Sequence, residues 1–186
     1  MQAPGGKGED PSGGFDLEGW TVPFFDDKAG KVMDEQMGQP FDLLPGRKTY
    51  DIFASYWPLQ NPDDPTVAAI NRAVNYVVTH RPIENEWRET MRIGNSVSDE
   101  IRKIKDENGP TLQVHGSSDL IQTLLVNDLV DELWLKTFPV VLGKGKRLFG
   151  GGVKPAALEL IKSIVTPSGV VVANYERTGM VKTGSF

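Results

Sequence analysis

Residues 43–50, LLPGRKTY, combine a glycine with side chains that suit an anionic ligand. Glycine lets a backbone approach a ligand closely, and a helix N-terminus after it presents N–H groups with a partial positive charge. Gly46 would supply that approach, while Arg47 and Lys48 add full charges and Thr49 adds a hydroxyl. The pattern predicts a phosphate site, unless Thr49 only caps a helix and Arg47 is a solvated charge.

A second turn of the same kind is VHGSSDL, residues 114–120. Here Gly116 is followed by Ser117 and Ser118, which offer N–H and O–H groups without a charge. Helix capping by either serine is the simpler explanation for this turn alone. Two such turns in one parallel sheet favour a ligand with several phosphates, as in a dinucleotide.

The segment VVTHRP follows a third expected strand and places Thr79, His80 and Arg81 at its end. An arginine beside a hydroxyl suits a ribose 2′-phosphate. A surface loop that Pro82 stops is an equally good interpretation.

Acid–base chemistry has its candidates at Asp26 and Asp27, which lie beside Trp20, Phe24 and Phe25 in the sequence. A carboxyl group among aromatic rings can have a raised pKa and donate a proton near neutrality. Capping of a helix N-terminus by the same aspartate is the competing interpretation, and the residues alone favour it.

The segment VVLGKGKRLFGGG, residues 140–152, matches the dinucleotide fingerprint only in part. Leu148 stands where the third glycine belongs, and no clear helix follows. No Gly-Lys-Ser/Thr follows at the spacing of a P-loop either. Taken alone, the segment reads as a basic surface turn.

The elements that position these residues follow from hydrophobic periodicity and from turn residues. Asp64 and Pro65 suit the start of a helix, and Gly109 suits the end of another. Helices are expected within 20–38, 47–57, 65–74, 97–108 and 117–128; strands within 41–44, 75–80, 111–115, 131–143, 157–166 and 169–178. This alternation predicts a three-layer αβα fold of the α/β class. Its mixed sheet is mainly parallel and ends in an antiparallel hairpin.

Composition narrows the function classes. The net charge of −5 disfavours nucleic acid as a partner, and no apolar run is long enough to span a bilayer. The absence of cysteine excludes disulfides and thiolate chemistry, and two isolated histidines make a histidine-based metal site untenable. Residue types alone leave a hard cation bound by carboxylates open. We expect a cytoplasmic protein with no bound metal. Residues 1–19 are rich in glycine and predict a flexible arm before one domain, 20–186.

Five segments in order make the chain similar to the dihydrofolate-reductase-like superfamily. They are APGGKGEDPSGGF, GRKTYDIFASYWP, VHGSSDLIQTLL, VDELWL and FPVVLGKGKRLF. The branch that it resembles contains the C-terminal reductase domain of the bifunctional riboflavin-biosynthesis deaminase-reductase. The resemblance implies the dihydrofolate-reductase-like fold, NADPH as hydride donor and a homodimer.

The resemblance also assigns roles to residues. It places Gly46, Arg47, Lys48 and Thr49 at the cofactor phosphates and the turn of Gly116, Ser117 and Ser118 at the pyrophosphate. It places Thr79, His80 and Arg81 at the adenosine 2′-phosphate. Near the cofactor and subunit contacts, it places Val141, Leu142 and Gly143.

Three departures qualify these expectations. Relatives begin with a strand central to the sheet, which we expect to be absent here through a shortened or mis-assigned start. Trp20, Pro23 and Asp26 resemble the Trp-x-x-Pro pattern before the acid of dihydrofolate reductase, with the aspartate one residue too far on. No deaminase zinc signature is present.

The sequence therefore predicts an NADPH-dependent reductase. Its substrate would be a small heterocycle or ribosylamino-pyrimidine, as in riboflavin synthesis, with a pterin or an unrelated carbonyl or imine as alternatives. A non-catalytic nucleotide-binding relative of the same fold is the competing hypothesis. A purely structural dimeric protein is a third, and it would have no nucleotide affinity.

Overall fold

The structure of the chain is a computed structural model that describes residues 1–84 and 87–185. It divides into two compact units. Lys31–Thr123 form one, called here the parallel-sheet unit. Met1–Gly30 together with Leu124–Phe186 form the other, called here the hairpin unit. The boundaries fall within two helices, α1 (Asp27–Met37) and α5 (Ser118–Val126).

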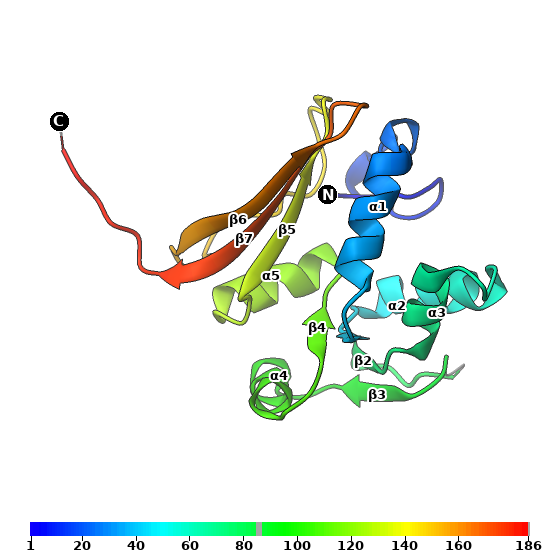
Figure 1. Cartoon of the computed structure of the whole chain (residues 1–186). Helices are drawn as coiled ribbons and strands as arrows, with labels where there is room; N and C mark the ends of the chain where they lie inside the picture. Colours follow the sequence, from blue (N-terminus) through cyan, green and yellow to red (C-terminus); the bar gives the residue numbers. More distant parts are fainter. Residues whose placement is uncertain (85–86, 186) are drawn as a thin grey trace. The chain divides into compact units, whose positions relative to one another are not determined.

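The parallel-sheet unit contains four strands in the order β3-β2-β1-β4, and all neighbouring pairs are parallel (Figure 1). Helices α2 and α3 connect β1 to β2, and α4 connects β3 to β4. A short 3-10 helix, η3 (Trp57–Leu59), follows α2. The strands are β1 (Phe41–Leu43), β2 (Asn75–Val78), β3 (Thr90–Ile93) and β4 (Thr111–Gln113); the helices are α2 (Arg47–Tyr56), α3 (Pro65–Arg72) and α4 (Val97–Asp106).

Local sequence explains the bounds of these helices. The Asp64 side chain accepts hydrogen bonds from Thr66 N and Val67 N, and Pro65 is the first helical residue, so α3 begins as expected. Helix α2 ends at Tyr56, before Pro58, which has no N–H group to continue the helical hydrogen bonds. Trp57 keeps helical angles and begins η3. Helix α4 ends at Asp106, before the Gly109 that the sequence predicted as its cap.

The core of this unit is a cluster of buried side chains from β1, β2, α1, α2 and α3 and from the segment before β3. Val77 is fully buried, and the Tyr50 ring lies 6.3 Å from the Trp87 ring. The Tyr50 hydroxyl accepts a hydrogen bond from Trp87 N at 2.7 Å, which satisfies a buried polar atom. The cluster contains Met37, Phe41, Leu43, Tyr50, Ile70, Ala73, Val77 and Trp87.

Strand β3 was not predicted from the sequence. It has four residues, of which Met91 and Arg92 are exposed and only Ile93 is buried. A strand this short without apolar alternation has no period-2 signal. It exists because it pairs with β2 along its whole length.

The hairpin unit contains three antiparallel strands in the order β5-β7-β6. They are β5 (Glu132–Thr137), β6 (Ala157–Val165) and β7 (Val171–Gly179). The β6–β7 hairpin was predicted, and Pro167, Ser168 and Gly169 form its turn. Gly169 has φ +84°, a conformation that suits glycine. Two 3-10 helices, η1 (Ser12–Gly14) and η2 (Val22–Phe24), precede α1.

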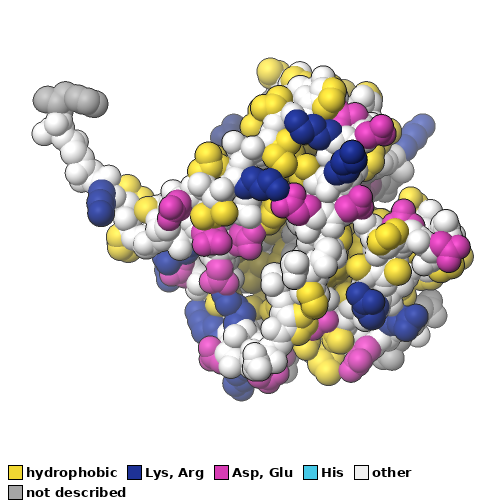
Figure 2. Space-filling view, viewed as in Figure 1, with side chains coloured by type: hydrophobic (Ala, Val, Ile, Leu, Met, Phe, Trp, Pro, Cys, Tyr) yellow, Lys and Arg dark blue, Asp and Glu magenta, His cyan; other side chains and the backbone are white. Residues whose placement is uncertain are grey.

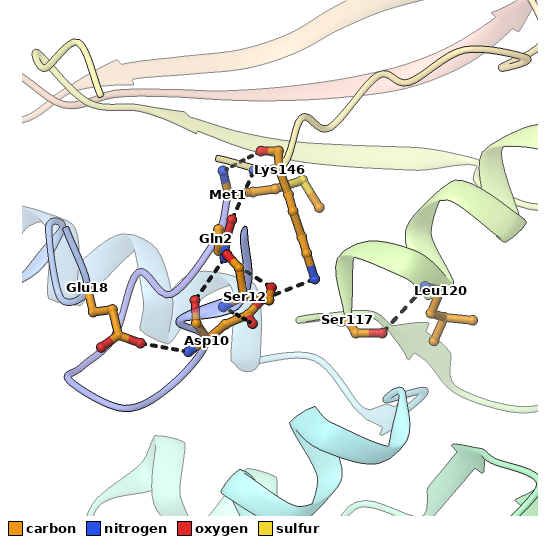
Figure 3. Close-up of polar contacts among 8 residues, drawn as sticks. All are labelled: Met1, Gln2, Asp10, Ser12, Glu18, Ser117, Leu120 and Lys146. Carbon is orange, nitrogen blue, oxygen red and sulfur yellow. Dashed lines mark hydrogen bonds and ion pairs between the residues drawn. The ribbon is translucent and has the colours of Figure 1, made fainter. Parts of the chain in front are cut away.

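Residues 1–19 pack within the hairpin unit through the side chain of Gln2, which is 4% exposed. Its Nε2 donates to the carbonyls of Asp10 and Ser12, both at 2.8 Å, and its Oε1 accepts from Lys146 N (Figure 3). Phe15 is buried as well. The division into an arm, 1–19, and one domain, 20–186, stays a prediction.

The α/β, dihydrofolate-reductase-like fold class predicted from the sequence is confirmed. One difference is that the strands are divided between two sheets. Within the parallel-sheet unit β4 pairs only with β1, and within the hairpin unit β5 pairs only with β7, among the described residues. Among the described residues, no helix is long and apolar enough to cross a membrane. Acidic and basic side chains are interspersed over the face shown in Figure 2.

Candidate functional site

The two glycine turns of the parallel-sheet unit touch each other. Gly46 N donates to Gly116 O at 3.4 Å. A Cβ atom on Gly46 would overlap the Ser117 hydroxyl, and one on Gly116 would lie 2.8 Å from Thr49 Oγ1. Gly116 also has φ +139°, which L side chains rarely adopt, and its peptide bond to Ser117 is cis. A side chain at either position would displace Ser117 or Thr49, and at Gly116 it would also strain the backbone.

The helices that begin at the two turns differ at their N-termini. Ser117 caps α5, because its Oγ accepts from Leu120 N at 3.4 Å (Figure 3) and its carbonyl accepts from Ile121 N. Helix α2 follows Gly46, which has no side chain to cap it. Thr49 lies inside α2 and is not its cap. The positive end of α2 is therefore the one suited to an anion.

Arg47 connects this turn to the third predicted segment. Its Nε donates to both carboxylate oxygens of Asp51, at 2.8 and 3.1 Å, and its Nη1 donates to Pro82 O at 2.6 Å. Asp51 compensates part of the positive charge. The Arg47 side chain is 22% exposed, so its guanidinium is held in position instead of moving freely in solvent.

The segment after β2 lies beside the first turn. Val78 N donates to Pro45 O at 3.0 Å, which joins the end of β2 to the residue before Gly46. Thr79 is buried and its hydroxyl accepts from Arg81 N at 3.1 Å, while His80 and Arg81 are exposed. Three of the predicted segments thus meet at the carboxyl edge of the parallel sheet.

The other predicted residues belong to the hairpin unit. Val141 is 98% exposed, Leu142 is half-buried, and Gly143 has φ +74° with open space around it. A role of these three near a cofactor stays a prediction. The long strand expected over 131–143 ends at Thr137, so they follow β5 as loop residues.

Asp26 has an environment opposite to that of a proton donor. It accepts hydrogen bonds from Ala29 N at 2.8 Å and from Ser168 N at 2.9 Å, so it caps α1 and also holds the hairpin turn. These bonds, with that of Ala29 the stronger, lower the pKa of Asp26 to about 2. The raised pKa considered from the neighbouring aromatic residues is wrong. Capping is what the structure shows.

The basic loop after β5 uses its lysines within the hairpin unit. Lys144 Nζ lies 2.9 Å from Asp16 Oδ1, and Lys146 Nζ lies 3.1 Å from Asp10 Oδ2. Gly145 has φ +116°, and a Cβ there would contact the Phe15 ring at 3.2 Å. This loop therefore holds residues 1–19.

His115 is a residue of the site that sequence reasoning missed. It directly precedes Gly116, its Nε2 lies 2.9 Å from Gln113 Oε1, and its ring lies 6.3 Å from the Phe53 ring. Gln113 in turn donates to Gln36 O at 2.9 Å. The alternation of a strand places residues i and i+2 on one face, so the pair could have been recognised from its spacing.

A fourth strand end was missed together with β3. Asn95 and Ser96 follow β3 as His115 and Gly116 follow β4, and their N–H groups donate to Glu100 Oε1 at 3.3 and 3.2 Å. Glu100 therefore caps α4 from within its first turn. A carboxylate already occupies these donors.

Comparison with known families decides the relationship of the chain. The sequence model of the RibD C-terminal domain matches residues 1–172. The chain belongs to the RibD C-terminal domain family. It is also 32% identical over 172 residues to the uncharacterized protein YyaP of Bacillus subtilis (strain 168), which covers 84% of this chain and 89% of YyaP. The predicted resemblance to the riboflavin-biosynthesis reductase branch is confirmed.

Solved structures agree with this family assignment at the level of the fold. A putative riboflavin biosynthesis protein from Shewanella sp. PV-4 has TM-score 0.61 at 22% identity and covers 83% of this chain and 81% of its own. A pyrimidine reductase-like protein from Corynebacterium diphtheriae has TM-score 0.59 at 13% identity, and the match covers 84% of this chain and 83% of that protein. Dihydrofolate reductase from Enterococcus faecalis, complexed with NADP(H) and RAB-propyl, has TM-score 0.54 at 13% identity. The match covers 80% of this chain and 81% of that protein.

Proposed function

We propose that this member of the RibD C-terminal domain family is an NADPH-dependent reductase. The observation that supports the proposal is the contact between the turns of Gly46 and Gly116, at the start of α2, where the glycine has no side chain to cap the helix. The dihydrofolate reductase that shares the fold was solved with NADP(H), which supports the same cofactor here. The cofactor would supply a hydride, and the chain would bind and orient it.

The residues at the carboxyl edge fit the anionic part of such a cofactor. The N–H groups at the start of α2 and the backbone of the Gly116 turn would receive its phosphates. Arg47 is a positioned cation for a 2′-phosphate, and Lys48, Thr79, His80 and Arg81 stand within the same segments. The substrate we propose is a small heterocycle or a ribosylamino-pyrimidine.

Reduction also requires a proton, and the environment of Asp26 argues against it as the donor. With a pKa of about 2, its carboxyl group is ionised at neutral pH. We propose His115 instead, because histidine is the side chain that most often transfers protons in enzymes and this residue directly precedes Gly116. Its hydrogen bond to Gln113 would orient the ring.

The first test is a titration of the full chain with NADPH and, separately, with NADH. Micromolar NADPH binding, about −8 kcal/mol, with much weaker NADH binding is the expected result. Arg47→Gln should weaken NADPH binding about tenfold, because a charge-assisted contact is lost, and leave NADH binding nearly unchanged. Arg72→Gln, in the last turn of α3, is the matched control. Failure to bind either nucleotide would contradict the proposal.

One observation favours a second candidate, a relative that binds the nucleotide without catalysis. The aspartate considered as the acid is engaged as a helix cap, so the chain has lost that candidate donor. NADPH consumption with a panel of pyrimidine, pterin and carbonyl substrates separates the two. Consumption that His115→Gln abolishes, with NADPH affinity retained, would support the reductase. Binding without any consumption would favour the second candidate.

We also propose that the protein is a cytoplasmic homodimer, as the resemblance implies. Exposed apolar side chains on β6, among them Leu160 and Ile161, are 51% and 49% exposed and offer surface for such an association. Sedimentation equilibrium of the full chain would give the mass of a dimer. A monomer at high micromolar concentration would contradict it.

A further inference from the structure

A cavity of about 300 Å³ lies within the hairpin unit. This volume is at the lower end of what small-molecule sites have. Its walls come from the end of α5, from all three strands β5, β6 and β7, and from residues 149–156. None of its lining residues belongs to the glycine turns, so the proposed reductase function does not account for it.

Most of the cavity wall is apolar. Two of its large side chains remain open to solvent, Phe149 with 51% and Leu158 with 40% of its surface exposed. Covering such side chains with an apolar ligand is favourable, because it removes apolar surface from water. The large apolar residues of the wall are Leu125, Val130, Leu133, Phe149, Val153 and Leu158.

Four charged side chains complete the wall, and they differ in whether a partner within the chain engages them. Asp128 binds Arg177 Nη2 through both carboxylate oxygens, at 2.9 and 3.0 Å, and Asp131 also has a partner. The Nε of Arg177 is buried and donates to no acceptor among the described residues. Lys154 has no hydrogen-bond or ion-pair partner within residues 1–84 and 87–185. Lys154 is therefore the one charged side chain of this wall that no partner among the described residues engages.

We propose that this cavity binds a small organic monoanion with an apolar body, such as a medium-chain carboxylate. The apolar part would cover Phe149 and Leu158, and the carboxylate would pair with Lys154, on the same wall as Arg177. A single carboxylate matches one unpaired lysine. A dianion would leave a charge unsolvated against the apolar wall. A dinucleotide is too large for about 300 Å³.

Three probes separate the apolar contribution from the charge: hexanoate, 1-hexanol and acetate. Each is titrated into the full chain and followed in amide ¹H–¹⁵N spectra. Hexanoate should bind at least tenfold more tightly than acetate, because its longer chain buries four more methylene groups. It should also bind about fivefold more tightly than hexanol, because only hexanoate pairs with the lysine. The amides that shift should lie in residues 125–133 and 149–158.

Two variants locate the binding and test the charge. Lys154→Gln should weaken the binding of hexanoate about fivefold and leave the affinity for hexanol unchanged. The matched control is Lys182→Gln, at an exposed lysine outside the cavity lining. It should change the affinity for neither hexanoate nor hexanol. Ala156→Trp places a large side chain in the cavity wall and should abolish binding of both six-carbon probes. Its fold is checked by the dispersion of the same spectra.

Three outcomes would overturn the proposal. Equal affinity for hexanoate and hexanol would reduce the site to a plain apolar pocket. Shifts elsewhere in the spectrum, or binding that survives a folded Ala156→Trp variant, would place the ligand outside the cavity. No saturable binding of hexanoate at millimolar concentration would mean that the cavity takes no such ligand. None of these results depends on whether the chain binds NADPH.

Discussion

Glycine-containing loops occur in both units of this chain and have different uses. In the parallel-sheet unit, the Gly46 and Gly116 turns touch through their backbones and lead into α2 and α5. In the hairpin unit, the loop of Gly143 and Gly145 has its lysines paired with aspartates of residues 1–19. The first arrangement leaves the N-terminus of α2 without a side-chain cap, and the second satisfies its charges internally.

The difference shows that glycine and lysine in a turn do not by themselves indicate an anion site. Both regions supply a counter-charge to their cations, so the difference lies in the contact between the two glycine turns at the start of α2. Asp10 and Asp16 supply the counter-charge for Lys146 and Lys144, from positions far away in the sequence. At Gly46 the local partner of Arg47 is Asp51, one turn later on the same helix. The following changes test this comparison.

Gly116→Ala should have the largest effect. The added Cβ meets Thr49 Oγ1 at 2.8 Å and φ is +139°, so strain and overpacking act together. We expect the free energy of unfolding to fall by about 3 kcal/mol in urea denaturation. The control is Gly143→Ala, with φ +74° and open space, which should lose only about 1 kcal/mol. Equal losses would remove the distinction between the two loops.

Gln2→Ala should come next. Its side chain is buried and serves two carbonyls and one N–H group, which lose their partners together. We expect a loss of about 2 kcal/mol in the free energy of unfolding and faster proteolysis within residues 1–19. Gln39→Ala, at an exposed glutamine, should change neither. An unchanged proteolysis rate would show that Gln2 does not hold the segment.

Lys146→Met tests the internal compensation of the loop directly. The ion pair with Asp10 is partly exposed, with 34% of the lysine and 14% of the aspartate side chain accessible. We expect a loss of about 1 kcal/mol at low salt. The difference should shrink toward zero at 1 M salt, where charges are screened over about 3 Å. Lys7→Met is the control, and a salt-independent loss would contradict an ionic role.

Asp26→Asn should have the smallest effect at neutral pH, because asparagine also caps helices. The folded-state pKa of Asp26, about 2, lies below its ordinary value of 3.8. The ionised carboxylate therefore stabilises the fold above pH 3.8, and this contribution is lost as the pH falls toward 2. The difference in urea midpoint between the two proteins should be constant from pH 7 to 5 and shrink between pH 4 and 2.

Asp27→Asn is the control for this change, at the neighbouring position without these hydrogen bonds. A difference that grows on acidification would contradict the lowered pKa. The same Asp26→Asn variant should leave NADPH consumption intact once a substrate is known. A loss of NADPH consumption in this variant would support Asp26 as the proton donor.

Much of the secondary structure was predictable because its signals are local. Helix α3 begins at Pro65 after the Asp64 cap, and the β6–β7 hairpin turns at Pro167–Gly169, as expected. The C-terminal bound of β5 was not predictable from the sequence. Its pairing with β7 ends at Thr137, although apolar residues continue to Leu142. Strand β3 had no signal at all, since a neighbouring strand defines it.

The candidate site was predictable in its parts and not in its contacts. Each glycine turn was recognised from its own residues, and parallel strands bring their carboxyl ends to one edge. That Gly46 and Gly116 touch, and that Arg47 reaches Pro82, depends on the register of β1, β2 and β4. The environment of Asp26 depends on Ser168, 142 positions later in the chain.

The sequence by itself determined the fold class, the helix starts and the chemical types at the strand ends, because caps, turns and periodicity act over a few residues. Only the tertiary structure decided which charged side chains are paired, why the pKa of Asp26 is lowered and where the two glycine turns touch. These properties depend on contacts of about 3 Å between atoms of residues far apart in the chain, and a hydrogen bond is lost when its donor and acceptor move much beyond that distance.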